Sequence, residues 1–226
     1  MNNTCPECAY AVNVCAQYSI NPKQPHAEAV RRICRYLKGT VNEGLYVQPH
    51  RDILSLDCHV DADYAGNWTL TEANDPKAVK SRAGYVITLG KFPVLWKSKR
   101  IQEICLSTME SEYISLSMAM RSLVYLRGLL FEVDSIFDLD LKDRLSSMST
   151  VFEDNQPALT LANTDPPRMT PRSKSLAVKY HWFRSKLSPT TIVVKYVASG
   201  DNVADIFTKA LPLDAFTKHR RTLCGW

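Results

Sequence analysis

Four short stretches of this chain each place an acidic side chain beside an apolar segment, and they constrain the fold more than any other feature. The stretches are VDADYAG at 60–66, STMESEY at 107–113, VFEDNQPAL at 151–159 and NVADIFTK at 202–209. The candidate carboxylates within them are Asp61, Glu112, Asp154 and Asp205, in that order along the chain. Residues this far apart can meet at strand ends and helix flanks, so we expect these side chains to converge at one end of a central sheet.

The chain from residue 53 onward alternates between strand and helix patterns. Strands are predicted at 53–60, 83–90, 92–98, 148–154 and 190–197 from their alternating or continuous apolar residues. The first three follow one another with no helix between them, which is typical of an antiparallel meander. The sequence therefore predicts a mixed α/β fold.

The clearest helix begins near residue 107. STME at 107–110 is a capping box, and the apolar stripe that follows it predicts a helix to about Val133. Glu110 is explained as the cap partner. Glu112 lies beside the buried stripe, where a carboxylate needs a functional reason, so Glu112 is the site candidate on this helix.

Shorter helices are predicted elsewhere. Residues 1–50 have the pattern of two helices and a hairpin, and Gly39 marks the end of the second helix. Short helices are expected after Pro157 and around Asp205, and a basic helix is expected over 171–187.

Bulk properties narrow the class of protein. A net charge of +5 and a pI near 8.8 suggest a polyanionic partner. Seven cysteines, an odd number scattered through apolar stretches, favour a reducing compartment. The sequence contains no run of 18 apolar residues and no basic-then-apolar secretion signal, so we expect a soluble protein that is neither secreted nor membrane-bound.

The acidic candidates suit one kind of chemistry. Carboxylate oxygens are the ligands that Mg²⁺ prefers, and carboxylates from several elements can hold a pair of such ions about 3.5–4 Å apart for phosphodiester hydrolysis. The chain contains 23 acidic residues, so their number alone is not specific. The residues around each candidate supply the specificity.

These surroundings agree in detail with one known family. The matching positions are Asp61-Ala62-Asp63, Glu112-Tyr113, Asp154-Asn155 and Asn202-Val203-Ala204-Asp205, together with the stretches SRAGYVITLG, WKSK, KYHWF and ADIFTK. In these features the chain resembles the ribonuclease H domain of copia-type retrotransposon Pol polyproteins, over residues 50–211. The segment RYLKGTVNEGLYV at 35–47 resembles the junction between reverse transcriptase and ribonuclease H in the same polyproteins.

The resemblance implies a fold and an activity. The fold is ribonuclease H-like α/β, with a mixed five-stranded sheet of three antiparallel and two parallel strands flanked by helices and an N-terminal helical extension. The activity is an endonuclease that hydrolyses the RNA strand of RNA–DNA hybrids with two Mg²⁺ ions, or Mn²⁺ in their place. Asp61, Glu112, Asp154 and Asp205 are implied to be both the catalytic residues and the metal ligands.

Neighbouring acids and two histidines receive lesser roles. Asp63 is expected to support the site without being a main ligand, and Glu153 and Asp201 are expected to be solvated. Many type I ribonucleases H carry a histidine in the loop before the last helix; residues 197–202 contain none, and copia-type domains often lack it. His59 and His181 are candidates to replace it, although a single histidine is more often structural.

Basic residues on the predicted 171–187 helix suggest how the substrate is held. Arg172, Lys179 and Lys186 recur every seven positions and form a stripe beside the apolar row, a pattern that fits either a phosphate-binding edge or a solvated helix face. Lys97, Lys99 and Arg100 are the next candidates for nucleic-acid contact.

The resemblance also predicts how the chain is organised. Residues 1–49 are expected to be a C-terminal remnant of reverse transcriptase or a connector, 50–211 the ribonuclease H-like domain, and 212–226 a C-terminal helix or tail. No Asp-Asp pair occurs, so the polymerase metal site of the family is not expected here. The expected partners are an RNA–DNA hybrid, reverse transcriptase and other parts of the polyprotein, in the cytoplasm within a virus-like particle or in the nucleus.

Three alternatives compete with this interpretation. An integrase or transposase nuclease shares the fold but needs a glutamate well downstream of the second aspartate, and no glutamate follows Glu153. A catalytically inactive nucleic-acid-binding module of the same fold remains open, as does a host protein that uses the fold as a scaffold.

Overall fold

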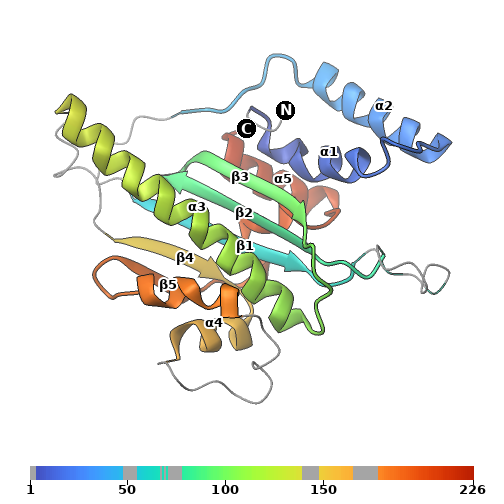
Figure 1. Cartoon of the computed structure of the whole chain (residues 1–226). Helices are drawn as coiled ribbons and strands as arrows, with labels where there is room; N and C mark the ends of the chain where they lie inside the picture. The colour runs from blue at the N-terminus through green and yellow to red at the C-terminus, as the bar shows by residue number, and fades with distance from the viewer. Residues whose placement is uncertain are drawn as a thin grey trace.

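A five-stranded sheet forms the centre of the computed structural model, which describes residues 4–47, 55–66, 68, 70, 78–138, 148–164 and 178–226 (Figure 1). The strands are β1 Leu56–Asp63, β2 Arg82–Leu89, β3 Phe92–Arg100, β4 Ser149–Glu153 and β5 Ile192–Tyr196. They lie in the order β3-β2-β1-β4-β5. β2 pairs antiparallel with β1 and β3, whereas β4 pairs parallel with β1 and β5. The expected mixed sheet of three antiparallel and two parallel strands is therefore confirmed.

β1 continues past the residue at which the sequence pattern predicts its end. Its ladder with β2 runs on to the pair Asp63–Arg82, so Asp61 lies inside the strand and not just after it. Cys58 and Val60 point into the main apolar core. Successive side chains of a strand point to opposite faces, so Asp61 projects from the other face of the sheet.

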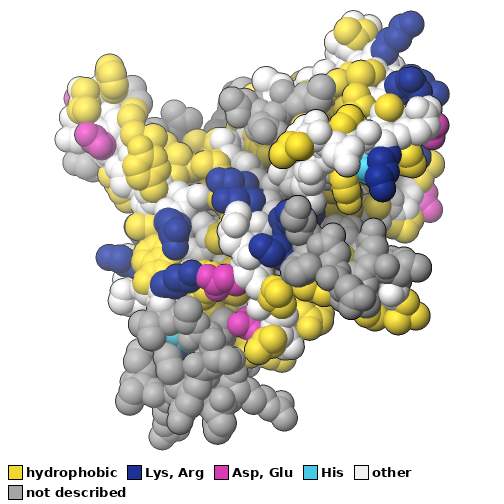
Figure 2. Space-filling view, turned by 45° about the vertical axis from the view of Figure 1, so that its right-hand side comes forward, with side chains coloured by type: hydrophobic (Ala, Val, Ile, Leu, Met, Phe, Trp, Pro, Cys, Tyr) yellow, Lys and Arg dark blue, Asp and Glu magenta, His cyan; other side chains and the backbone are white. Residues whose placement is uncertain are grey.

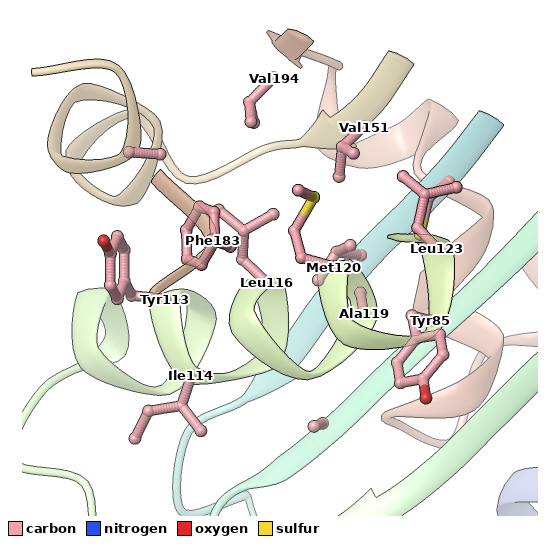
Figure 3. Packing of buried hydrophobic residues seen from close by; sticks show 14 of the residues in the cluster. Tyr85, Tyr113, Ile114, Leu116, Ala119, Met120, Leu123, Val151, Phe183 and Val194 are labelled. Atoms are coloured by element: carbon pink, nitrogen blue, oxygen red, sulfur yellow. The ribbon is translucent and has the colours of Figure 1, made fainter. Parts of the chain in front are cut away.

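Helix α3, Thr108–Phe137, covers the core face of the sheet (Figure 1). The Ser107 hydroxyl accepts a hydrogen bond from the Glu110 amide at 3.2 Å, and a Glu110 carboxylate oxygen accepts one from the Leu106 amide at 2.7 Å. The predicted cap is thus present. Figure 3 shows Leu116 and Met120 of α3 directed toward Val151 of β4.

The C-terminal half of α3 projects beyond the sheet. The helix ends at Phe137, four residues after the predicted Val133, followed by Asp138 in the left-handed conformation with φ of 47°. Tyr125 and Ile136 are exposed there. Within the described residues, α3 is the one helix long and apolar enough to cross a membrane, but its N-terminal half packs on the sheet as the core helix of this domain.

The opposite face of the sheet is covered by elements from both ends of the chain. Besides α3, the helices among the described residues, on either face of the sheet, are η1 Pro6–Cys8, α1 Ala9–Ala16, α2 Gln24–Gly39, α4 Gln156–Asn163, η4 Val178–Tyr180, η5 Trp182–Lys186, η6 Ser199–Asp201, η7 Val203–Phe207 and α5 Leu213–Cys224. A second apolar cluster joins Ala9 to Val86 of β2, Phe207 of η7 and Leu223 of α5. The N-terminal segment therefore packs as part of this layer.

Arg82 ties the sheet to α1. Its guanidinium donates hydrogen bonds to Asn13 Oδ1 at 2.5 Å and to Ser98 Oγ at 3.0 Å, and lies 5.2 Å from the centre of the Tyr10 ring. Arg82 is almost fully buried, and these interactions partner its Nη1 atom, whereas its buried Nη2 atom has no hydrogen-bond partner among the described residues.

Two local predictions are wrong within the described residues. Residues 178–186 form the short 3₁₀ helices η4 and η5 instead of one basic α-helix, and residues 40–47 contain no strand of the predicted hairpin. Tyr180, the last residue of η4, and Phe183 of η5 are both buried in the main apolar cluster. Packing of these aromatic residues against α3 therefore overrides the longer helical pattern.

Candidate active site

The parallel pairing of β1 and β4 brings the first two aspartates to the same edge of the sheet. Cys58 of β1 pairs with Val151 of β4, and Asp61 and Asp154 each follow three residues later. Glu112 approaches from the second turn of α3, and Asp205 approaches from η7 on the opposite face. Four different elements therefore supply the predicted carboxylates.

These carboxylates form two triplets that share Asp154. One oxygen each of Asp61, Asp154 and Asp205 lie within 4.8 Å of one another. One oxygen each of Glu112, Glu153 and Asp154 lie within the same distance of one another. The structure thus brings the four predicted site residues together and adds a fifth acid, Glu153.

Asn202 positions the segment that carries Asp205. Its side-chain nitrogen donates to the Val60 carbonyl at 2.7 Å, and its side-chain oxygen accepts from the Ala204 amide at 3.2 Å. Asn202 is fully buried. One residue therefore caps η7 and fixes it to β1 immediately before Asp61.

A glycine permits the close approach between η7 and the sheet. A Cβ atom at Gly84, which pairs with Asp61, would lie 2.5 Å from Thr208 Cγ2 and 2.8 Å from Phe207 Cβ. The Thr208 hydroxyl donates a hydrogen bond to Asp61 Oδ2. On the α3 side, the Ser115 hydroxyl donates to the Asp61 carbonyl oxygen at 2.9 Å. Asp61 is therefore held from both faces of the sheet.

The site concentrates negative charge in a buried place. Burial, reinforced by the Asp205 carboxylate, raises the pKa of Asp61 to about 7. Burial and then the Glu153 carboxylate raise the pKa of Glu112 to about 11. Burial also raises the pKa of Glu153 well above its usual range. The ionised form of each of these three carboxyl groups is unfavourable, because it is removed from solvent and lies near other carboxylates.

One cation partly offsets this charge. The Lys209 ammonium lies 2.9 Å from Asp205 Oδ1 and 3.9 Å from Asp61 Oδ2. Burial lowers the pKa of Lys209, but the nearby carboxylates, Asp61 first, outweigh it and raise that pKa overall. Lys209 is not among the residues predicted for the site, although a lysine four residues after Asp205 is a recognisable signal.

Glu153 and Asp201 are both predicted to be solvated, and the structure shows that Glu153 is buried and Asp201 is exposed. The Glu153 side chain is 0% exposed, because β4 is a central strand with α3 packed over the face on which Glu153 lies. Asp201 is exposed and forms an ion pair with Lys218 at 2.6 Å. Asp63 belongs to neither triplet in the described part of the chain.

His59 and His181, the two candidate histidines, pack against aromatic residues. His59 stacks on Phe152 with ring centres 4.6 Å apart, and burial lowers its pKa to about 4. His181 Nδ1 lies 3.0 Å from the Tyr113 hydroxyl, and burial lowers its pKa as well. Neither belongs to the carboxylate triplets.

The predicted basic residues that the structure describes differ in their exposure and in their partners. Lys97 and Lys99 are exposed on the edge strand β3, whereas Arg100 points to the opposite face and donates to Gln17 Oε1 at 3.3 Å. Lys179 forms an ion pair with Glu103, and Lys186 is exposed on η5. Arg172 lies outside the described residues. Figure 2 shows basic side chains gathered in the middle of one face of the molecule.

The donor set fits a hard divalent cation. It consists of carboxylate oxygens, and the buried Oε2 atoms of Glu112 and Glu153 have no hydrogen-bond partner. Asp205 Oδ1 likewise accepts no well-aligned hydrogen bond, despite its ionic contact with Lys209. Buried carboxyl oxygens without hydrogen-bond partners, gathered in one place, fit the ligands of an oxygen-coordinated ion.

The strand order, the change from antiparallel to parallel pairing at β1 and the helix α3 over the sheet define a ribonuclease H-like α/β fold, as the sequence motifs imply. Among solved structures, the N-terminal RNase H domain of a Mycobacterium tuberculosis protein aligns with 75% of this chain and 98% of that domain, at 14% identity and a TM-score of 0.46.

Comparison of sequences identifies the relatives. No protein-family model matches the chain. The retrovirus-related Pol polyprotein from transposon RE1 of Arabidopsis thaliana is 32% identical over 94% of this chain, which covers 13% of the polyprotein. The Pol polyprotein from transposon TNT 1-94 of Nicotiana tabacum is also 32% identical over 94% of this chain, which covers 14% of that polyprotein. Both relatives are copia-type Pol polyproteins of retrotransposons, and the chain spans a small fraction of their length.

Proposed function

We propose that this chain is the ribonuclease H module of a retrotransposon Pol polyprotein and hydrolyses the RNA strand of RNA–DNA hybrids. The observation that carries this proposal is the meeting of Asp61, Glu112, Asp154 and Asp205 at one edge of β1 and β4. Four elements, separated by long stretches of sequence, deliver carboxylates to one place that a stable fold alone does not need.

The carboxylates suit divalent ions, for which we propose Mg²⁺, with Mn²⁺ as a substitute. When bound, such ions activate a water molecule and stabilise charge on the leaving oxygen of a phosphodiester. Asp61, Asp154 and Asp205 would hold one ion, and Glu112 with Asp154 would contribute to a second. Asp154 belongs to both triplets and is therefore the residue whose loss should affect both ions.

Other residues keep the carboxylates in place. The Thr208 hydroxyl orients one oxygen of Asp61, and Asn202 fixes the start of η7 so that Asp205 faces the same edge. The hydrogen-bonded partners of metal ligands typically affect metal affinity or activity by about 10–100-fold when removed. These two polar residues are thus positioning residues of the proposed site.

The substrate and partners are inferred from charge and homology. The basic side chains Lys97, Lys99 and Lys186 are exposed and are available to bind phosphates. Homology to Pol polyproteins suggests that reverse transcriptase and other polyprotein parts are partners. We propose that residues 50–211 form the nuclease and that residues 1–49 and 212–226 are the preceding connector and a terminal helix.

Cleavage of a labelled hybrid tests the proposal. Mg²⁺ should support cutting of the RNA strand of an RNA–DNA duplex, and EDTA should abolish it. Asp154→Asn should abolish cleavage while hybrid binding persists, because the substitution removes a ligand common to both triplets. Asp201→Asn removes an exposed carboxylate of the same type and should cleave at the wild-type rate.

Two outcomes would change the conclusion. Wild-type protein that binds the hybrid but does not cut it with Mg²⁺ or Mn²⁺ would be a catalytically inactive binding module of this fold. Equal cleavage by the wild type and by Asp154→Asn would place the reaction away from these carboxylates.

A further inference from the structure

Glu153 occupies a position where a structural residue would ordinarily be apolar. It is the last residue of β4, and Ser149 and Val151 precede it on the same face, both fully buried. Val151 lies in the main apolar cluster beneath α3. A fully buried glutamate following it carries a large desolvation cost, which the surroundings must offset.

The backbone provides a hydrogen-bond donor for one of the two carboxylate oxygens of Glu153. Oε1 accepts a hydrogen bond from the Asn155 amide at 3.0 Å, in the turn that leads into α4. The Asn155 side chain accepts from the Ala158 amide at 3.0 Å and caps that helix, so the turn is fixed from both sides. Oε1 is thereby held, and Oε2 is left without a hydrogen-bond partner although it is buried.

Glu112 also has a buried carboxyl oxygen without a hydrogen-bond partner. Its side chain is 4% exposed, and its Oε2 atom is buried without a hydrogen-bond partner. The ion pairs formed by described residues include neither Glu112 nor Glu153. One oxygen of each lies within 4.8 Å of the other and of an Asp154 oxygen. Two glutamates with unpaired buried oxygens and the Asp154 carboxylate therefore face a common point.

We propose that Glu153 is a fifth metal ligand, which together with Glu112 and Asp154 holds one divalent cation beside the ion held by Asp61, Asp154 and Asp205. This inference rests on the proposed function, since it assigns an additional ligand to the same site. A hard cation among these three carboxylates supplies the positive charge that neither glutamate obtains from an ion pair with a described residue, and it offsets the repulsion between the carboxylates. Glu153 then sets the affinity of the ion nearer α3.

Direct ion binding tests the assignment without relying on activity. Free Mn²⁺ is measured by its electron paramagnetic resonance signal during titration of the full chain. Glu153→Gln keeps the shape of the side chain and removes its charge, and it should weaken the affected Mn²⁺ site by about tenfold or more. Glu132→Gln makes the same chemical change at an exposed position of α3 and should bind Mn²⁺ as the wild type does.

A second variant tests whether Glu153 binds the ion directly or acts only through its negative charge. Glu153→Asp keeps the negative charge but withdraws the carboxylate by one methylene, so it should also weaken Mn²⁺ binding. Cooperative thermal unfolding in EDTA verifies that each variant is folded. Because glutamine is uncharged and Glu153 has no cation beside it in EDTA, the melting temperature of Glu153→Gln in EDTA should equal or exceed that of the wild type.

The outcomes distinguish this inference from the proposed function. If Glu153→Gln or Glu153→Asp retains wild-type Mn²⁺ affinity while Asp154→Asn loses it, the metal site stands and Glu153 is not a ligand. In that event Glu153 is a neutral acid that shares a proton with Glu112. If the wild type itself binds no Mn²⁺, the proposed metal-dependent function fails together with this assignment.

Discussion

The Lys209 ammonium lies 2.9 Å from one oxygen of Asp205 and 3.9 Å from one oxygen of Asp61. It therefore supplies positive charge to the triplet at the point where two aspartates would otherwise repel each other. Lys209 follows Asp205 by four residues, so the same short segment carries both the carboxylate and its counter-ion.

Replacing Lys209 should destabilise the metal-free protein. Lys209→Met removes the cation but keeps an unbranched side chain, and the free energy of unfolding in EDTA should fall by roughly 1–3 kcal/mol, as for other charge-assisted hydrogen bonds. Saturating Mg²⁺ should reduce this decrease, because bound ions replace the missing positive charge. Chemical denaturation with and without Mg²⁺ measures both quantities.

Lys218→Met is the matched control for that experiment. Lys218 also pairs with an aspartate, Asp201, but both side chains are largely exposed. Exposed ion pairs contribute about 0–1 kcal/mol, so this variant should remain near wild-type stability. Equal destabilisation of the two variants would show that the ion pair at the site has no special role.

Gly84→Ala should loosen the packing between η7 and the sheet. The added methyl group would meet Thr208 and Phe207, both fully buried, and overpacking of this kind costs about 1–3 kcal/mol. Gly128→Ala is the control, since no atom lies within 4 Å of a Cβ at that helical position. The control should be stabilised by roughly 0.5–1 kcal/mol, because alanine favours a helix interior over glycine. Thermal melting of the two variants in parallel would reveal whether Gly84 behaves as an ordinary surface glycine instead.

The metal-free protein should become less stable as the pH rises. The pKa of Asp61 is about 7 in the folded chain and 3.8 as a model value, so the folded state binds more protons between these values. The contribution of Asp61 to the free energy of unfolding is therefore complete below pH 3.8 and is lost as the pH rises through 7. The same sign holds for Glu112, whose pKa is raised from 4.5 to about 11.

Unfolding curves in EDTA across this pH range check the direction. Asp61→Asn should flatten the decline between about pH 4 and 7, where one such group changes stability by at most about 1.4 kcal/mol per pH unit. Mg²⁺ should raise the melting temperature more at pH 8 than at pH 6, because metal binding favours deprotonated ligands. Parallel pH curves for the wild type and Asp61→Asn would mean that Asp61 does not titrate in this way.

The exposed lysines of β3 should contribute to hybrid binding. Lys97→Ala with Lys99→Ala should reduce the slope of log affinity against log salt by about one unit for each phosphate that is no longer neutralised, without changing which strand is cut. Lys179→Ala should have a smaller effect, since Glu103 already neutralises Lys179. Lys186→Ala tests the remaining exposed position of the predicted stripe. Unchanged slopes in all of these variants would place the phosphate-binding residues on another surface.

Local sequence determines much of this protein. The alternation in β1, the cap at Ser107 and the order of the four aspartate and glutamate candidates are all readable from neighbouring residues. The short helices near Pro157 and Asp205 also follow local patterns, and the structure adds that Asn155 and Asn202 cap them. These features depend on backbone periodicity and on hydrogen bonds that span a few residues, which is why sequence patterns report them.

Tertiary packing decides which of the charges meet. Alternation along β4 determines that Glu153 lies on the other face of the strand from Phe152 and Asp154. Only the packing of α3 over this central strand excludes solvent from that face and brings Glu153 near Glu112. The ionic contact of Lys209 with Asp61 and the close approach of η7 to Gly84 similarly join residues far apart in the chain. Burial and charge depend on what covers a residue in space, and neither β4 nor η7 carries that information in its own sequence.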